Sequence, residues 1–176
     1  MKSRAAKFIR SLKQSADLDH LRTAFEIATE GIRLRSLLSQ WQDMDMLLVA
    51  RDGCPPCHLR DLTHILHSAT DIYLSGVFDY ELIHWQMLGV VVPTLDENSI
   101  QMHVARIIHT SQQLLIGSAV SPLLLLFPLR VAGARSWSKL QQTSIASLLS
   151  HIETMFLVAA AFRQELTELW ETRGKG

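Results

Sequence analysis

The chain has 176 residues, of which 48% are hydrophobic and 19% are charged, a composition that excludes an intrinsically disordered protein or a coiled coil. Its 17 basic and 17 acidic side chains cancel to a formal charge of +0, so we expect no direct DNA binding, which needs a surplus of Lys and Arg. Two cysteines are too few for a disulfide scaffold and are typical of a protein from a reducing intracellular compartment.

The first 16 residues form a basic segment. Its charged residues precede the first acidic residue, Asp17, and alternate with apolar ones: Lys2, Arg4, Lys7, Phe8, Ile9, Arg10, Leu12 and Lys13. This pattern is typical of an organellar presequence and equally of a basic patch on an ordinary first helix; it lacks the continuous apolar region of a secretory signal. We predict a basic amphipathic segment over 1–16 and a single helical domain over 17–173.

The spacing of apolar residues predicts one helix after another. Residues 17–39 and 57–76 have the helical period, although Gly31 weakens the first helix. Between them lie a short apolar-rich piece over 41–50 and a turn over 51–56. Residues 90–92 could form a short strand, but no partner strand is evident. Further helices are expected from a cap at Asp96 or Ser99 to Gly117, over 137–151 and over 153–171.

An apolar run over 121–133 contains an internal proline. Ser121 and Pro122 suit the start of a helix, Gly133 is a plausible C-cap, and Pro128 should kink or split the run. Spanning a bilayer takes about 20 apolar residues, so we predict a buried helix and no membrane partner. The expected fold is all-α, an irregular multi-helix bundle with this proline-containing helix buried at its centre.

One sequence motif has the spacing of a haem, redox or zinc site. Cys54, Cys57 and His58 form C-x-x-C-H, but an export signal, a βαβ context or further zinc ligands would be needed for these uses. Asp61 and His64 follow on the face of Cys57. Because Ser68 and Asp71 continue that face, we interpret it as a solvated polar stripe opposite Leu59, Leu62 and Leu66. We therefore predict no metal and no cofactor; the residues that come nearest to a metal site are Cys54, Cys57, His58 and His64.

Eight histidines are present, but none has the spacing of a Ser-His-Asp or Cys-His arrangement. His64 and His67 share a helical face, whereas His84, His103, His109 and His151 are scattered. A phosphate-binding glycine loop of either common pattern is also missing. We predict no catalytic residue, and hence a protein that is not an enzyme.

From about His64 onward, five segments occur in a familiar order. They are an Ala to Tyr-Leu helix over 69–74, a helix over 104–115, the run 124–134 with a large residue before proline and an Ala-Gly pair after it, a helix over 140–152, and a terminal helix with a tryptophan over 165–170. This order resembles the C-terminal part of the fungal-specific transcription factor domain, the regulatory region that follows the zinc binuclear cluster in many fungal activators.

The resemblance implies a helical regulatory domain that binds a protein partner, such as another transcription regulator, or a small-molecule effector. The family's DNA-binding cluster needs six cysteines, whereas this chain has Cys54 and Cys57. The front half of the family's domain is missing or replaced by residues 1–50, and Arg130 and Arg135 lie where the family tends to be apolar or acidic. The expected function is regulation of a fungal secondary-metabolite gene cluster without a DNA-binding domain of its own, in the nucleus or alternatively the cytoplasm.

Two alternatives remain open. One is a cofactor-free cyclase or isomerase of a biosynthetic pathway, acting in an apolar pocket with a histidine or carboxylate at its edge. The other is a degenerate, inactive fragment.

Overall fold

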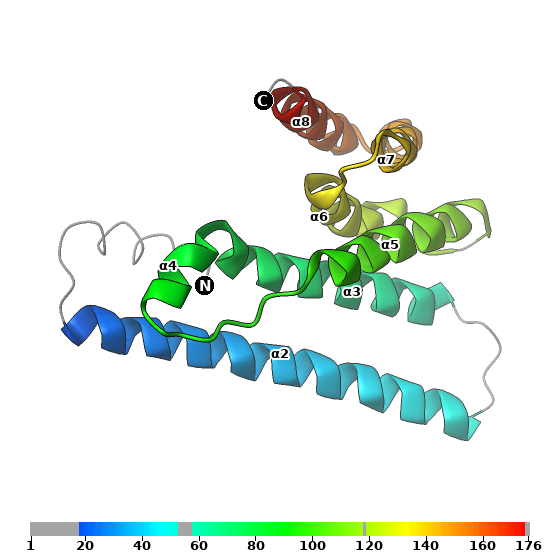
Figure 1. Ribbon diagram of the computed structural model, residues 1–176. Coiled ribbons are helices and arrows are strands. Elements are labelled where there is room, and N and C mark those ends of the chain that lie inside the picture. The colour runs from blue at the N-terminus through cyan, green and yellow to red at the C-terminus, as the bar shows by residue number, and fades with distance from the viewer. Residues whose placement is uncertain (1–17, 53–57, 118, 175–176) are drawn as a thin grey trace. The chain divides into compact units, whose positions relative to one another are not determined.

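The computed structural model describes residues 18–52, 58–117 and 119–174 (Figure 1). These ranges are almost entirely helical and contain no strand, which confirms the prediction of an all-α bundle. Residues 1–16, Cys54 and Cys57 lie outside them. The chain divides into two compact units, Met1–Asp52 with Tyr73–Leu95 and Gly53–Ile72 with Asp96–Gly176, and whether they act as the single domain expected over 17–173 stays a prediction.

The first unit contains the longest helix, α2 (Leu18–Asp52), the end of α3 (His58–Phe78), the 3-10 turn η1 (Asp79–Glu81) and α4 (Leu82–Met87). The apolar-rich piece expected over 41–50 is part of the same helix as residues 18–39, because α2 continues to Asp52. The core combines side chains of α2 with others from α3, α4 and the segment after α4: Ala24, Ile27, Ala28, Leu74, Val77, Phe78, Trp85 and Val90. Phe78 and Trp85 meet edge to face with their ring centroids 5.5 Å apart, a favoured aromatic geometry.

Gly31 does not interrupt α2, and its missing side chain leaves space for core residues of the first unit. A Cβ at this position would lie 2.6 Å from Cζ of Phe78 and 3.0 Å from Cγ of Pro93. The helix therefore approaches Phe78 more closely than any larger residue would permit.

The segment after α4 is extended but pairs with no strand. Gly89, at φ 65°, ends α4; its N–H bonds to Gln86 O and that of Val90 to Trp85 O, the Schellman arrangement in which glycine is favoured. Further along, side chains form hydrogen bonds with the backbone groups: Arg35 donates to Pro93 O (2.8 Å), and Leu95 N–H donates to Ser75 Oγ (2.8 Å). Residues 90–92 therefore need no strand partner.

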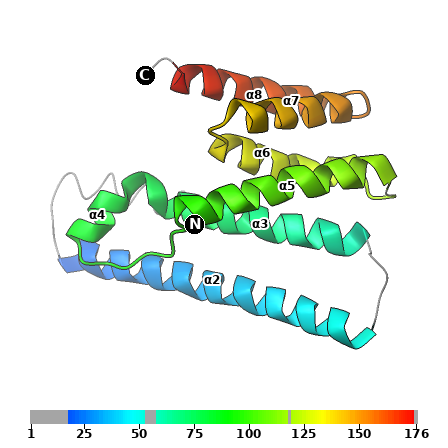
Figure 2. The same ribbon diagram turned by 45° about the vertical axis from the view of Figure 1, so that its right-hand side comes forward.

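The second unit contains the first part of α3 and four further α-helices of the described chain, α5 (Glu97–Gly117), α6 (Leu126–Arg135), α7 (Lys139–Glu153) and α8 (Val158–Arg173). Asp96 caps α5, as predicted: its carboxylate accepts from Ser99 N–H (2.9 Å) and Ser99 Oγ–H (2.7 Å). In both views α6 lies between α5 and the α7–α8 pair (Figures 1 and 2), and it contacts all three helices. The predicted central helix is therefore α6.

Pro128 explains how the run 121–133 folds. The run is split into a 3-10 turn, η2 (Pro122–Leu125), and α6, so that Pro128 falls in the first turn of α6, where its missing N–H costs no intrahelical hydrogen bond. Ser121 makes no side-chain cap. Gly133 is not the C-cap that the sequence suggested, because α6 continues to Arg135. No helix among the described residues has the length and apolarity to cross a bilayer.

Candidate functional site

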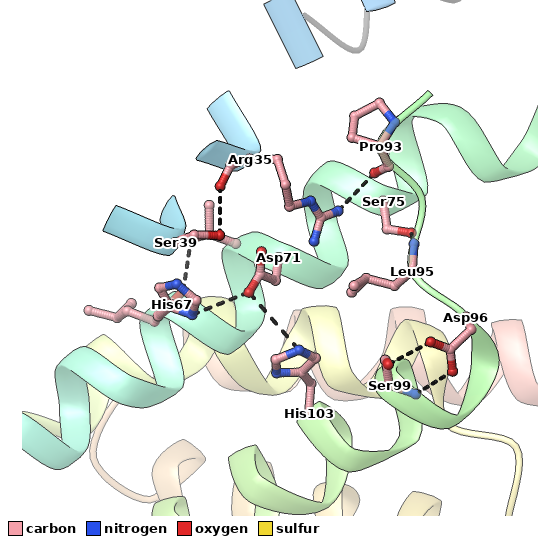
Figure 3. Close-up of polar contacts among 12 residues, drawn as sticks. Arg35, Ser39, His67, Asp71, Ser75, Pro93, Leu95, Asp96, Ser99 and His103 are labelled. Atoms are coloured by element: carbon pink, nitrogen blue, oxygen red, sulfur yellow. Dashed lines mark hydrogen bonds and ion pairs between the residues drawn. The ribbon is translucent and has the colours of Figure 1, made fainter. Parts of the chain in front are cut away.

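A buried polar cluster links α3 to α5 inside the second unit. Figure 3 shows the Asp71 carboxylate between two imidazoles: Nδ1 of His67 lies 3.2 Å from its Oδ2, and Nε2 of His103 lies 4.0 Å from the same oxygen. Asp71 and His67 are buried, and His103 is half-buried. A buried carboxylate needs such partners, so we assign the cluster a structural role.

The burial of this cluster corrects the interpretation of α3. Ser68 and Asp71 were expected on a solvated stripe, but Ser68 is 0% and Asp71 7% exposed, whereas Leu59, expected on the apolar face, is 66% exposed. On this side of α3, His103 of α5 in the same unit lies next to the Asp71 carboxylate, with its Nε2 4.0 Å from Oδ2. The hydroxyl of Ser68 on α3, like that of Ser111 on α5, is buried without a hydrogen-bond partner in the described part of the chain.

Of the four residues that come nearest to a metal site in the sequence, the structure describes His58 and His64. His58 is exposed at the first residue of α3, and His64 is half-buried two turns later. A separation of six residues along the helix turns their side chains about 120° apart. Within residues 18–52, 58–117 and 119–174, no group of three or more His, Cys, Asp or Glu side chains is placed to hold a metal ion.

The candidate site is a surface groove between α5 and α7, both in the second unit. Its volume is about 570 Å³, within the range of small-molecule sites. The last turns of α5 contribute Gln112, Leu115 and Ile116. Ile116 is 89% exposed, so its side chain offers apolar surface at the groove.

The α7 side of the groove is mostly polar. Thr143, Ser144, Ser147 and His151 lie along it, and Leu148 forms the buried floor. Spacings of three and four residues place these side chains on one face of the helix. The groove therefore has an apolar wall on α5 and a hydroxyl-rich wall on α7.

Most polar side chains of the groove make no hydrogen bond within the described residues. Thr143 donates its hydroxyl to Lys139 O at 2.8 Å, but the side chains of Gln112, Ser144, Ser147 and His151 make no hydrogen bond within the described residues. Glutamines elsewhere on α7 are engaged: Gln141 donates to Oε1 of Gln101 at 2.9 Å. Several donors and acceptors therefore remain available in the groove.

Compared with known proteins, the chain matches no family model, no curated protein and no solved structure. The resemblance to the fungal-specific transcription factor domain therefore rests on the order of its five segments and stays a prediction.

Sequence reasoning found neither the groove nor the polar cluster. His67 and Asp71 have the i, i+4 spacing of a helical ion pair, a signal that could have been noticed. His103 gave no such signal, because it comes from another helix. His151 was described as one of the scattered histidines, but its place in the same groove as Ile116 depends on how α5 and α7 pack.

Proposed function

We propose that the chain is a transcription-factor-like regulatory domain without a DNA reader of its own, which acts by binding a small effector or a protein partner. The observation that carries this proposal is the α5–α7 groove, with its exposed Ile116 and its unpartnered polar side chains. Exposed apolar surface next to free hydrogen-bonding groups is the usual composition of a recognition site.

The regulatory setting comes from the segment order that resembles the fungal-specific transcription factor domain. A formal charge of +0 and two cysteines in the whole chain support a regulator that does not contact DNA itself. The proposed process is control of a secondary-metabolite gene cluster in the nucleus, with the cytoplasm as the alternative, and the proposed protein partner is another transcription regulator.

The test is to measure transcripts after changing the groove in the source organism. We expect Ile116→Asp to alter the transcripts of several genes in the same direction as deletion of the gene, because it places a charge on the apolar wall. Met102→Asp is the matched control, since Met102 is also exposed on α5 (65%) but lies outside the groove. Unchanged transcripts in the deletion strain would refute a regulatory role. A gel shift with sequence-specific DNA binding by the purified chain would refute the absence of a DNA reader.

A second candidate, a cofactor-free isomerase or cyclase, is favoured by one feature. His151 is a titratable group at the edge of a groove with apolar residues, and histidine is suited to acid–base chemistry near neutral pH. His151→Gln would then block a pathway intermediate while transcripts stay unchanged. If deletion changes neither transcripts nor metabolites, the chain is an inactive fragment.

A further inference from the structure

We infer that the groove between α5 and α7 takes an uncharged amphipathic small molecule, with its apolar body against α5 and a hydroxyl or carbonyl oxygen on α7. This inference rests on the proposed binding role of the groove and specifies the chemistry of its ligand.

The two walls set the orientation of the ligand. Leu115 and Ile116 on α5, together with the floor residue Leu148, are the apolar residues that line the groove. Covering Ile116, which is 89% exposed, removes apolar area from water and favours binding. An apolar face of the ligand therefore belongs on this side.

The opposite wall requires hydrogen-bonding groups. The hydroxyls of Ser144 and Ser147 have no partner within the described residues, and covering them with a purely apolar ligand would desolvate them without compensation. Each hydroxyl can donate and accept, so a hydroxyl or carbonyl oxygen on the ligand satisfies them. Gln112 adds an amide at the α5 edge.

The charge of the lining excludes an ion as the main ligand. None of the lining side chains is a Lys, Arg, Asp or Glu, and His151 is the one titratable group among them. An ionised ligand would lose hydration in the groove without gaining a counter-charge.

The same wall argues against a partner helix as the occupant. Helix-in-groove recognition places an apolar helical face against an apolar groove. Here, such a face would cover Ser144 and Ser147, and the backbone of a helix interior has no free donor or acceptor to offer them. A small molecule with its own oxygen atoms can contact the apolar wall on α5 and form hydrogen bonds with the wall on α7.

The experiment uses the full chain with labelled Ile and Leu methyl groups and three probes of one size: 2-naphthol, naphthalene and 2-naphthalenesulfonate. A phenol-type hydroxyl titrates near pH 10, so 2-naphthol is neutral at pH 7. We expect 2-naphthol to shift the methyl signals of Leu115, Ile116 and Leu148 saturably, with a Kd on the order of a millimolar for so small a ligand. The exposed methyls of Leu140, outside the groove, should not move.

Variants test the polar wall. Ser144→Ala with Ser147→Ala should weaken 2-naphthol binding roughly five- to tenfold, the equivalent of about one lost hydrogen bond, and bring it to the affinity of naphthalene. Ser150→Ala is the control, because Ser150 is exposed on α7 and does not line the groove. Equal or tighter binding of 2-naphthalenesulfonate, shifts that spread to Leu140, or no saturable shift with 2-naphthol would overturn the inference.

The experiments can refute the regulatory role and the ligand class independently of each other. If Ile116→Asp changes transcripts but 2-naphthol does not bind, the regulatory role stands and the ligand class is wrong. If 2-naphthol binds as described but deletion leaves transcripts unchanged, the site is right and the regulatory role is wrong.

Discussion

Gly133 on α6 and Leu166 on α8 are in contact so close that a Cβ at position 133 would overlap the Leu166 side chain, with Cδ2 at 2.9 Å and Cδ1 nearer still. Leu166 is 1% exposed, so its rotamer is confined by neighbours. Next to this contact, Nε1–H of Trp170 donates to Gly133 O at 2.9 Å. The glycine therefore sets the distance between α6 and α8.

We expect Gly133→Ala to destabilise the protein by about 1–3 kcal/mol, because overpacking outweighs the better helix propensity of alanine. Gly76→Ala on α3 is the control: a Cβ there meets nothing within 4 Å, so it should stabilise by up to about 1 kcal/mol. Urea unfolding followed by circular dichroism measures both.

A double-mutant cycle identifies the contact itself. Leu166→Ala costs about 2–5 kcal/mol on its own, but it removes the atoms that a Cβ at 133 would strike. The double variant should lose at least about 1 kcal/mol less than the sum of the single losses. Additive losses would mean that the cost of Gly133→Ala arises elsewhere.

The first helix shows what the sequence could predict of the fold and what it could not. The helical period over 17–39 correctly predicted a helix. However, Phe25 (52% exposed) and Ile32 (45%) face outward, while Ala24 (0%) and the buried Gly31 face the core. Hydrophobicity patterns favour large residues as the inner face, whereas close approach to Phe78 selects small ones. That selection depends on a residue far along the chain.

Pro128 and the groove also show that local sequence patterns predict single helices but not how helices pack. The sequence predicted that Pro128 would kink or split the run 121–133, because a proline's effect on its own helix is local. The groove combines residues of α5 and α7 that no local pattern connects. The helices over 96–117 and 137–151 could be predicted, but the place of Ile116 and His151 in one groove depends on the packing of α5 and α7 against α6.

Removal of the buried hydroxyl of Ser111 should stabilise the protein. It is 0% exposed and has no hydrogen-bond partner in the described residues, so folding desolvates it without compensation. We expect Ser111→Ala to stabilise the protein by about 1 kcal/mol or more. Ser150→Ala, at an exposed position of α7, gains helix propensity alone and should stabilise by less. Hydrogen exchange of the α5 and α7 amides measures the difference, and equal gains would show that Ser111 is hydrated in solution.

Asp96 gives α5 a pH-dependent cap. Hydrogen bonds from the Ser99 side chain and then from the Ser99 backbone lower the pKa of Asp96 below its ordinary value. A lowered pKa in the folded state means that the cap stabilises fully above the ordinary aspartate range, and that this contribution is lost as the pH falls through the lowered pKa. We expect Asp96→Ala to speed hydrogen exchange in the first turn of α5 several-fold at neutral pH.

Asp96→Asn separates the cap from its charge. Asparagine still accepts from the Ser99 N–H and is a good N-cap, but it does not titrate. First-turn exchange should stay close to that of the unchanged chain near pH 7 and lose the acid-dependent opening. If Asp96→Asn opens the turn as much as Asp96→Ala, the charge itself is the stabilising element.

Arg130 and Glu165 form an exposed bidentate pair between α6 and α8. Nε of Arg130 lies 2.9 Å and Nη2 2.6 Å from the two carboxylate oxygens, while the side chains remain 45% and 51% exposed. The hydrogen bonds and then the charge of Arg130 lower the pKa of Glu165. The pair therefore stabilises above the ordinary glutamate range, and its contribution is lost as the pH falls through the lowered pKa. Because solvent screens the pair, Glu165→Gln should cost less than about 1 kcal/mol at low salt and less still in 1 M salt, where the Debye length is about 3 Å.

Glu171→Gln, at an exposed position of the same helix, is the control in the same urea titrations. A cost for Glu165→Gln that salt leaves unchanged would mean that packing of the Arg130 guanidinium on Phe162, 5.7 Å from the ring centroid, holds α6 and α8 together at this point rather than charge.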